Sequence, residues 1–190
     1  QHTRPFEIEQ ALRRDFSANR ELAARQRLAV AHIETEAVLE SRYTGADGVR
    51  RLYSLDAVQD IHRELFNRLP TEDLNPDAGP VIAPGILRTR EVSVGHHIAP
   101  AWQAVPTFLT GWAEVYGNTR RGEAALLALA AAHQRLGWVH PFVDGNGRVA
   151  RAVGDLMLAR ADGSPQRFYS LSAQIQRERK AYYEVLERTQ

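Results

Sequence analysis

A chain of 190 residues is long enough for one domain with a helical extension, and it can fold without disulfides or a structural metal. Its 24 Lys and Arg residues balance 23 Asp and Glu residues, so the net charge of +1 gives no electrostatic reason to expect nucleic acid or an acidic membrane as a partner. The absence of cysteine excludes disulfides, thiolate metal sites and cysteine nucleophiles, and no run approaches the roughly 18 apolar residues of a membrane-spanning helix. We therefore expect a cytoplasmic protein. The first residues contain no secretory signal and no initiating Met, as in a piece of a longer protein.

The first quarter of the chain predicts two helices. Pro5 suits a first helical position, and residues 6–16 have mixed helical spacing. Ser17 is expected to cap a long helix over residues 18–42, whose interior consists of strong helix formers. The Thr-Gly-Ala-Asp-Gly run at 44–48 ends that helix.

Residues 55–69 carry the clearest helical pattern, with Ser54 as the cap and Pro70 at the end. Side chains three or four apart form its apolar face: Leu55, Val58, Ile61, Leu65 and Phe66. Residues 70–90 are rich in Pro and Gly and predict a loop. The stretch 86–98 alternates apolar and polar residues, which predicts a short β-hairpin.

The second half of the chain is predicted to be helical. We expect helices over residues 107–116, 122–138, 146–160 and 171–190, with a turn at 162–165. There is no internal repeat. The predicted fold class is all-α with one small hairpin.

The loop between two of these helices carries groups that bind phosphate. Gly145 and Gly147 flank Asn146, and glycine permits the backbone angles that turn successive N–H groups toward one point. A helix is expected to begin there, and its free N–H groups favour an anion. Arg148 and Arg151 are three residues apart, so they share a face and add two guanidinium groups.

Two further residues indicate which reaction this loop supports. The carboxylate of Asp144 is compatible with phosphate when a Mg²⁺ ion bridges them, and a neutral His140 can take a proton from an incoming hydroxyl. Taken singly, a Gly-Asn-Gly run is usually a turn, a lone histidine is usually structural, and two arginines on a helix are usually solvated. Together within twelve residues they indicate phosphoryl or nucleotidyl transfer.

The run from His140 to Arg151 resembles the signature of the Fic (filamentation induced by cAMP) domain, His-x-Phe-x-Asp/Glu-Gly-Asn-Gly-Arg-x-x-Arg, at every defining position. The resemblance covers residues from about 50 onward, so we expect an N-terminal helical segment at 1–50 and a catalytic core at 51–190. It implies the mainly helical Fic fold, with residues 88–98 as a flap that aligns the backbone of a target protein. We expect His96 and His97 to be loop residues rather than catalysts.

The resemblance also implies a reaction, AMPylation with ATP as substrate and Mg²⁺ as cofactor, and roles for the motif residues. His140 would deprotonate a Ser, Thr or Tyr hydroxyl of the target, Asp144 would hold Mg²⁺, and Phe142 would anchor the loop in the core. The remaining motif residues would bind the phosphates: Gly145, Asn146 and Gly147 as the anion hole with Asn146 on the α-phosphate, Arg148 on the β-phosphate and Arg151 on the γ-phosphate.

The last helix carries two tyrosines that the resemblance places near the adenine. Tyr182 or Tyr183 would stack on the base, although aromatic side chains that close the helix onto the core explain them equally well. His133, seven residues before His140, is interpreted as a packed histidine.

The long first helix holds a second signal. Val30, Glu34 and Val38 are four residues apart and fall on one stripe, so the Glu34 carboxylate needs a cation. Many Fic proteins carry an inhibitory helix with the pattern Ser/Thr-x-x-x-Glu-Gly/Asn, which Val30 to Thr35 matches in part. The resemblance implies autoinhibition through a Glu34–Arg151 pair, whereas an ordinary surface glutamate would pair with a neighbouring arginine.

Other functions stay open at this point. A glutamate of this kind also serves AMP removal from a modified target, and a non-catalytic nucleotide-binding regulatory module or transfer of another phosphate-containing group are further alternatives. The expected partners are ATP and a protein with an acceptor hydroxyl, or the chain itself, and a homodimer is left open. We infer no nucleic-acid or membrane partner.

Overall fold

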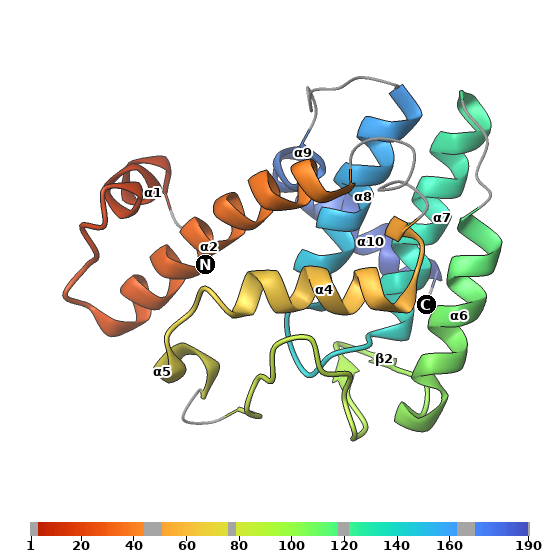
Figure 1. Ribbon diagram of the computed structural model, residues 1–190, viewed down its shortest axis with the longest axis horizontal. Helices are drawn as coiled ribbons and strands as arrows, with labels where there is room; N and C mark the ends of the chain where they lie inside the picture. The colour runs from red at the N-terminus through yellow and green to blue at the C-terminus, as the bar shows by residue number, and fades with distance from the viewer. Residues whose placement is uncertain (1–3, 44–50, 76–78, 118–121, 163–169, 190) are drawn as a thin grey trace.

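The computed structural model describes residues 4–43, 51–75, 79–117, 122–162 and 170–189 (Figure 1). The predicted fold class is confirmed, since helices dominate and the described residues contain a single sheet, the antiparallel pair β1 (Ser93–Val94) and β2 (His97–Ile98). The helices are α1 (Pro5–Leu12), α2 (Arg20–Tyr43), α4 (Leu55–Phe66), α5 (Thr71–Leu74), the 3-10 helix η1 (Trp102–Ala104), α6 (Val105–Tyr116), α7 (Glu123–Val139), α8 (Asn146–Asp162), α9 (Leu171–Arg177) and α10 (Arg179–Thr189). The predicted turn at 44–48 and most of the turn at 162–165 lie outside the described residues.

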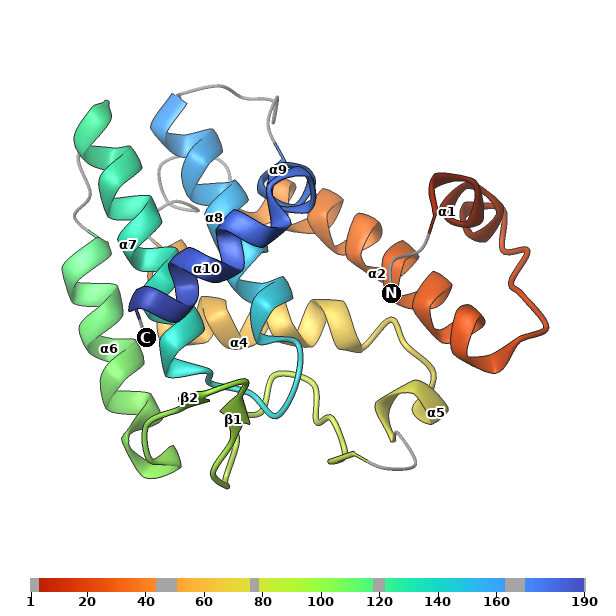
Figure 2. The same ribbon diagram turned by 180° about the vertical axis from the view of Figure 1, so that it is seen from behind.

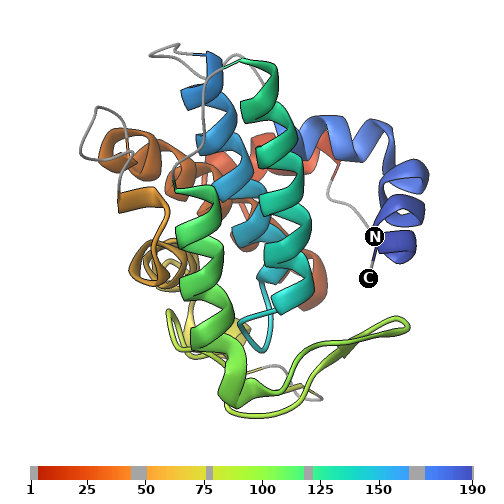
Figure 3. The same ribbon diagram turned by 90° about the vertical axis from the view of Figure 1, so that its right-hand side faces the viewer.

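The core lies where α4 crosses a layer made by α6, α7 and α8, which stand side by side in Figure 3. Its buried side chains come from these four helices, from the end of α2 and from the loop between α7 and α8: Leu39, Tyr43, Ala57, Val58, Ile61, Val105, Leu109, Trp112, Ala132, Leu136, Val139, Phe142, Val149, Val153 and Met157 among them. Of the apolar face that the sequence predicts for α4, Val58 and Ile61 pack in this core, whereas Leu65 and Phe66 pack in a second buried cluster with Ala31, Leu69 and Ile82. Ser54 caps this helix by accepting a hydrogen bond from the Ala57 N–H at 3.0 Å.

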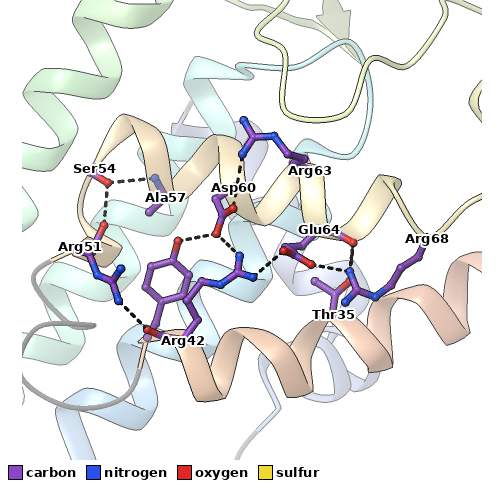
Figure 4. Close-up of polar contacts among 10 residues, drawn as sticks. Thr35, Arg42, Arg51, Ser54, Ala57, Asp60, Arg63, Glu64 and Arg68 are labelled. Carbon is purple, nitrogen blue, oxygen red and sulfur yellow. Dashed lines mark hydrogen bonds and ion pairs between the residues drawn. The ribbon is translucent and has the colours of Figure 1, made fainter.

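Polar side chains attach α2 to α4 (Figure 4). Arg42 contacts Asp60 at 2.5 Å and Glu64 at 2.7 Å, and the Tyr43 hydroxyl donates to Asp60 at 3.0 Å. Thr35 is buried, and its hydroxyl is satisfied by donating to the Glu64 carbonyl at 3.2 Å. The buried stripe of α2 therefore includes Thr35, whereas the sequence analysis placed Glu34 on the buried face.

The start of α2 differs from the sequence prediction. Asn19, rather than Ser17, caps α2, because its side-chain oxygen accepts the Leu22 N–H at 3.0 Å. The Ser17 hydroxyl instead accepts the Asn19 N–H at 3.1 Å. α1 is held on α2 by the buried Gln26, whose amide donates to the Glu7 carbonyl at 3.0 Å.

Two other elements also differ from the prediction. The short helix α5 lies inside the segment that was predicted to be a loop. The single last helix is divided into α9 and α10 at Glu178, and Ser170 caps α9 by accepting the Ala173 N–H at 3.2 Å. Figure 2 shows this pair in front of α7 and α8. None of the helices in the described residues has the length and the apolar character that crossing a membrane requires.

Candidate active site

His140 follows the last residue of α7, in the left-handed backbone conformation with φ 50° and ψ 61°. Its Nδ1 lies 3.1 Å from the Gly137 carbonyl, which can only accept, so Nδ1 carries the proton and Nε2 presents a lone pair. Burial lowers the pKa of His140, and the charge of Arg88 lowers it further. The imidazole is therefore neutral at neutral pH, in the tautomer that a general base needs.

The loop after His140 is closed by the side chain of Asn146. Its amide oxygen accepts the Phe142 N–H and its amide nitrogen donates to the Phe142 carbonyl, both at 2.8 Å. Phe142 is fully buried, which confirms its predicted place as the anchor of the loop. The Asn146 side chain, 3% exposed, is thus engaged in shaping the loop, which the sequence analysis did not foresee when it placed Asn146 on the α-phosphate.

Gly145 is needed at the sharpest point of this loop. Its φ of 81° lies in the region that favours glycine, and a β-carbon here would lie 2.6 Å from Cζ of Phe66 and closer still to Cε2. The Gly145 N–H donates to the Asp144 carboxylate at 2.6 Å. This bond orients Asp144 at the mouth of the loop, where its side chain is exposed.

His62 supports Asp144 from beneath and is a residue that the sequence analysis missed. Its ring stacks on Phe142 at a centroid distance of 3.9 Å and lies 4.4 Å from the ring of Phe66. Nδ1 accepts the Gly85 N–H at 2.8 Å, so Nε2 carries the proton and donates to the Asp144 carbonyl at 3.2 Å. Burial lowers the pKa of His62 to about 4. A histidine on the apolar face of α4 was the available signal.

The start of α8 provides a positive site. The N–H groups of Asn146 and Gly147 are the first of the helix, where no carbonyl of the helix can accept them. Arg148 and Arg151 are half-buried, and neither has an ion-pair partner in the part of the chain that the structure describes. A β-carbon on Gly147 would lie 3.2 Å from the Arg151 guanidinium, so that guanidinium covers the first turn. The predicted phosphate-binding residues are therefore brought together.

A pocket of about 460 Å³ separates this loop from the hairpin. It is lined by His140, Val143 and Asp144 on one side, and by Pro80 and residues 90–94 on the other. Asp144 is the single acidic side chain that the loop contributes, and the described residues hold no cluster of three metal ligands. One exposed carboxylate beside an anion site fits Mg²⁺, which proteins often bind through one or two carboxylates together with substrate phosphates.

Glu34 does not make the predicted contact. Its carboxylate lies 2.6 Å from Arg14 and 4.0 Å from Arg68, and its side chain is 41% exposed. The predicted Glu34–Arg151 pair is thus wrong for this structure. The reason is the rotation of α2, which buries Val30, Ala31 and Thr35 and leaves Glu34 at the edge of the apolar face. Arg14 itself is 64% exposed, and such surface pairs contribute about 0.2–1 kcal/mol, so this pairing alone does not fix the carboxylate in place.

The two tyrosines of α10 occupy different environments. Tyr182 is half-buried, and its hydroxyl lies 2.9 Å from Nε2 of His133, whose Nδ1 contacts the Ala150 carbonyl at 3.0 Å. Nδ1 must therefore be the donor, and the tyrosine hydroxyl donates to Nε2. His133 is 8% exposed, which confirms that it is a packed histidine. Tyr183 is 48% exposed beneath Arg179, so a place for either tyrosine beside the adenine stays a prediction.

Comparisons with known proteins agree with this arrangement. The Fic/DOC family model matches residues 52–158, more than half of the chain. The protein adenylyltransferase Fic of Drosophila mojavensis is 30% identical over 129 residues, which are 67% of this chain and 24% of that protein. The corresponding protein of Drosophila virilis is 28% identical over the same length. The chain thus spans about a quarter of the length of these curated relatives.

Solved structures share the fold. A Fic family protein from Desulfovibrio desulfuricans superposes with a TM-score of 0.73 at 18% identity, covering 97% of this chain and 51% of that one. A fragment of Fic-1 from C. elegans superposes with a TM-score of 0.63 at 20% identity, covering 84% and 44%. The family match, together with the closed loop from His140 to Arg151, leads to one conclusion: this chain belongs to the Fic/DOC family.

Proposed function

We propose that the chain transfers AMP from ATP to a hydroxyl group of a protein. One observation carries the proposal. His140, with its free Nε2, and Asp144 line the same pocket, and α8 begins two residues after Asp144 in the sequence. A base, a carboxylate for a cation and an anion site are the parts that nucleotidyl transfer requires.

His140 acts as the general base. The target oxygen attacks the α-phosphorus of ATP, and its proton passes to Nε2 of His140. The bond between the α-phosphorus and the oxygen that bridges to the β-phosphorus breaks, and pyrophosphate leaves. Because burial keeps His140 neutral, the lone pair that takes the proton is present before the target arrives.

The remaining motif residues hold the triphosphate. The N–H groups of Asn146 and Gly147 donate to phosphate oxygens, and Arg148 and Arg151 donate through their guanidinium groups. Asp144 would hold Mg²⁺, which would supply positive charge beside the phosphates. Asn146 contributes its backbone to this site, since its side chain is bonded to Phe142.

The target is proposed to bind along the hairpin. Ser93 and Val94 of β1 are exposed and line the pocket that also contains His140. An extended segment that adds to this edge would bring its own hydroxyl toward the base by backbone pairing, with little dependence on its side chains.

The test is incorporation of label from ATP that carries a radioactive α-phosphate, with Mg²⁺, into the chain itself or into proteins of a cell extract. His140→Ala should abolish the labelling. The matched control is His32→Ala, a histidine that contacts Glu36 on α2 and should leave labelling unchanged.

The outcomes separate the alternatives. Label from γ-labelled ATP instead would indicate phosphate transfer and contradict the proposal. Release of free AMP from a modified protein, with no labelling in any variant, would favour AMP removal. ATP binding with neither reaction would favour a regulatory module, and it would also contradict the proposal.

A further inference from the structure

The side chain of Arg88 is fully buried, at 0% exposure. Its nearest carboxylate is Glu91, whose side chain is 61% exposed and lies 3.9 Å away. Burial lowers the pKa of Arg88, as expected for a charge removed from water. A buried charge is tolerated when its donors are satisfied, so its hydrogen bonds reveal what the residue does.

Among the described residues, all the hydrogen bonds of the Arg88 guanidinium go to backbone carbonyls. They belong to three segments: the end of α7 (Val139 at 3.4 Å and His140 at 2.8 Å), the arm before β1 (Arg90 at 2.9 Å) and the arm after β2 (Pro100 at 2.5 Å). The backbone N–H of Arg88 also donates, to the Pro141 carbonyl at 2.9 Å. One side chain therefore binds both arms of the hairpin to the backbone of His140.

The end of α7 depends on these donors. The last carbonyls of a helix have no N–H partner within it, and Pro141 removes one N–H that would otherwise follow. Nε2 of His97, in β2, donates to the Trp138 carbonyl at 2.8 Å, and Arg88 donates to the next two carbonyls. Arg88 and His97 thus cap α7, the helix that is followed by the general base His140.

The strand pairing of the hairpin is too short to stabilise it alone. Its strands are two residues each, and a hairpin of this size is not stable alone. We infer that Arg88 is a positioning residue that fixes the hairpin and His140 in one geometry. It sets where a target bound on the hairpin lies relative to the base. Its effect on transfer rests on the proposed function, whereas its anchoring of the hairpin does not.

The experiment compares Arg88→Lys with the wild-type chain in two assays. Lysine keeps the charge but has its donors on a single nitrogen, which cannot reach three segments as the planar guanidinium does. Hydrogen exchange of the amides at 88–99 should speed up about tenfold or more, because the hairpin opens locally. AMP transfer should fall about tenfold to a hundredfold, the loss typical of a displacement of about 1 Å, while the Kd for ATP stays within about twofold.

The matched control is Trp112→Phe. It removes another buried donor to a backbone carbonyl, the bond from Nε1 of Trp112 to Ala132 at 2.9 Å, far from the hairpin in the chain. This variant should lower the melting temperature but leave the hairpin exchange and the transfer rate per folded molecule unchanged. If Arg88→Lys does not fold, His97→Ala, which removes the neighbouring bond to the Trp138 carbonyl, should show a smaller change of the same kind in both assays.

Unchanged hairpin exchange in a folded Arg88→Lys protein would overturn the inference, and so would transfer at the wild-type rate. A wild-type chain without any transfer would contradict the proposed function alone, because the exchange assay would still decide whether Arg88 anchors the hairpin.

Discussion

Replacing Gly145 with alanine should lower the free energy of unfolding by about 1–5 kcal/mol. Holding alanine at a φ of 81° costs about 1–2 kcal/mol. The new β-carbon would overlap the ring of Phe66, which is 1% exposed and held against His62, and such overpacking costs about 1–3 kcal/mol. Alanine also stabilises the protein by about 0.4–1 kcal/mol, because it lowers the conformational entropy of the unfolded chain, so the net effect remains destabilising.

Urea unfolding followed by circular dichroism measures this difference, and Gly111→Ala serves as its control. Gly111 lies inside α6 with nothing within 4 Å of an added β-carbon, so alanine there should stabilise the protein by about 0.5–1 kcal/mol. The two substitutions are chemically identical and should have opposite signs. Gly145→Ala with wild-type stability, or Gly111→Ala with a comparable loss, would refute the reasoning.

Two further predictions concern the contact between α7 and α10. Tyr182→Phe removes the hydroxyl bonded to His133 and should cost about 0.5–1.5 kcal/mol in urea unfolding, whereas an unchanged midpoint would show that this bond does not hold α10. Burial lowers the pKa of His133 below 6.5, so its contribution to stability is complete above pH 6.5 and is lost as the pH falls toward the lowered pKa, by at most about 1.4 kcal/mol per pH unit. In His133→Gln, the free energy of unfolding should therefore depend less on pH between about pH 7.5 and pH 5 than it does in the wild-type chain.

Much of the fold could be predicted because local signals agreed with the tertiary packing. In α4, the cap at Ser54 and the apolar spacing point to one helix with one buried face, and the structure contains both. The loop from Asp144 to Arg151 was predictable for a similar reason, since glycines, a helix start and two arginines are all legible in sequence order.

The rotation of α2 could not be predicted in this way. Its small and apolar residues lie on several sides, so the stripe through Glu34 and a neighbouring stripe through Thr35 fit the pattern almost equally well. Long-range partners make the choice, because the Thr35 hydroxyl reaches the Glu64 carbonyl and Tyr43 reaches Asp60. Those partners lie in α4, and nothing in the sequence of α2 identifies them.

The supporting residues of the site were hidden for a related reason. Arg88 lies in the stretch 86–98, whose alternation predicts a hairpin but not a buried arginine, and its partners are backbone carbonyls, which every residue has. The side chain of Asn146 turned inward to Phe142, although its position in the motif fits a ligand contact equally well. Spacing along the chain does not determine which way such a side chain points.

The reversal of the chain between α7 and α8 has an electrostatic consequence. The two helices pack antiparallel, so the carbonyl end of one and the N–H end of the other meet within the six residues 140–145. A helix carries about half a negative elementary charge at its carbonyl end and about half a positive charge at its N–H end. In the proposed reaction the proton moves to His140, at the negative end, while phosphate charge stays at the positive end. The short loop would thus place the protonated His140 in a negative potential and the phosphates in a positive one. Both potentials come from backbone that the fold has already ordered.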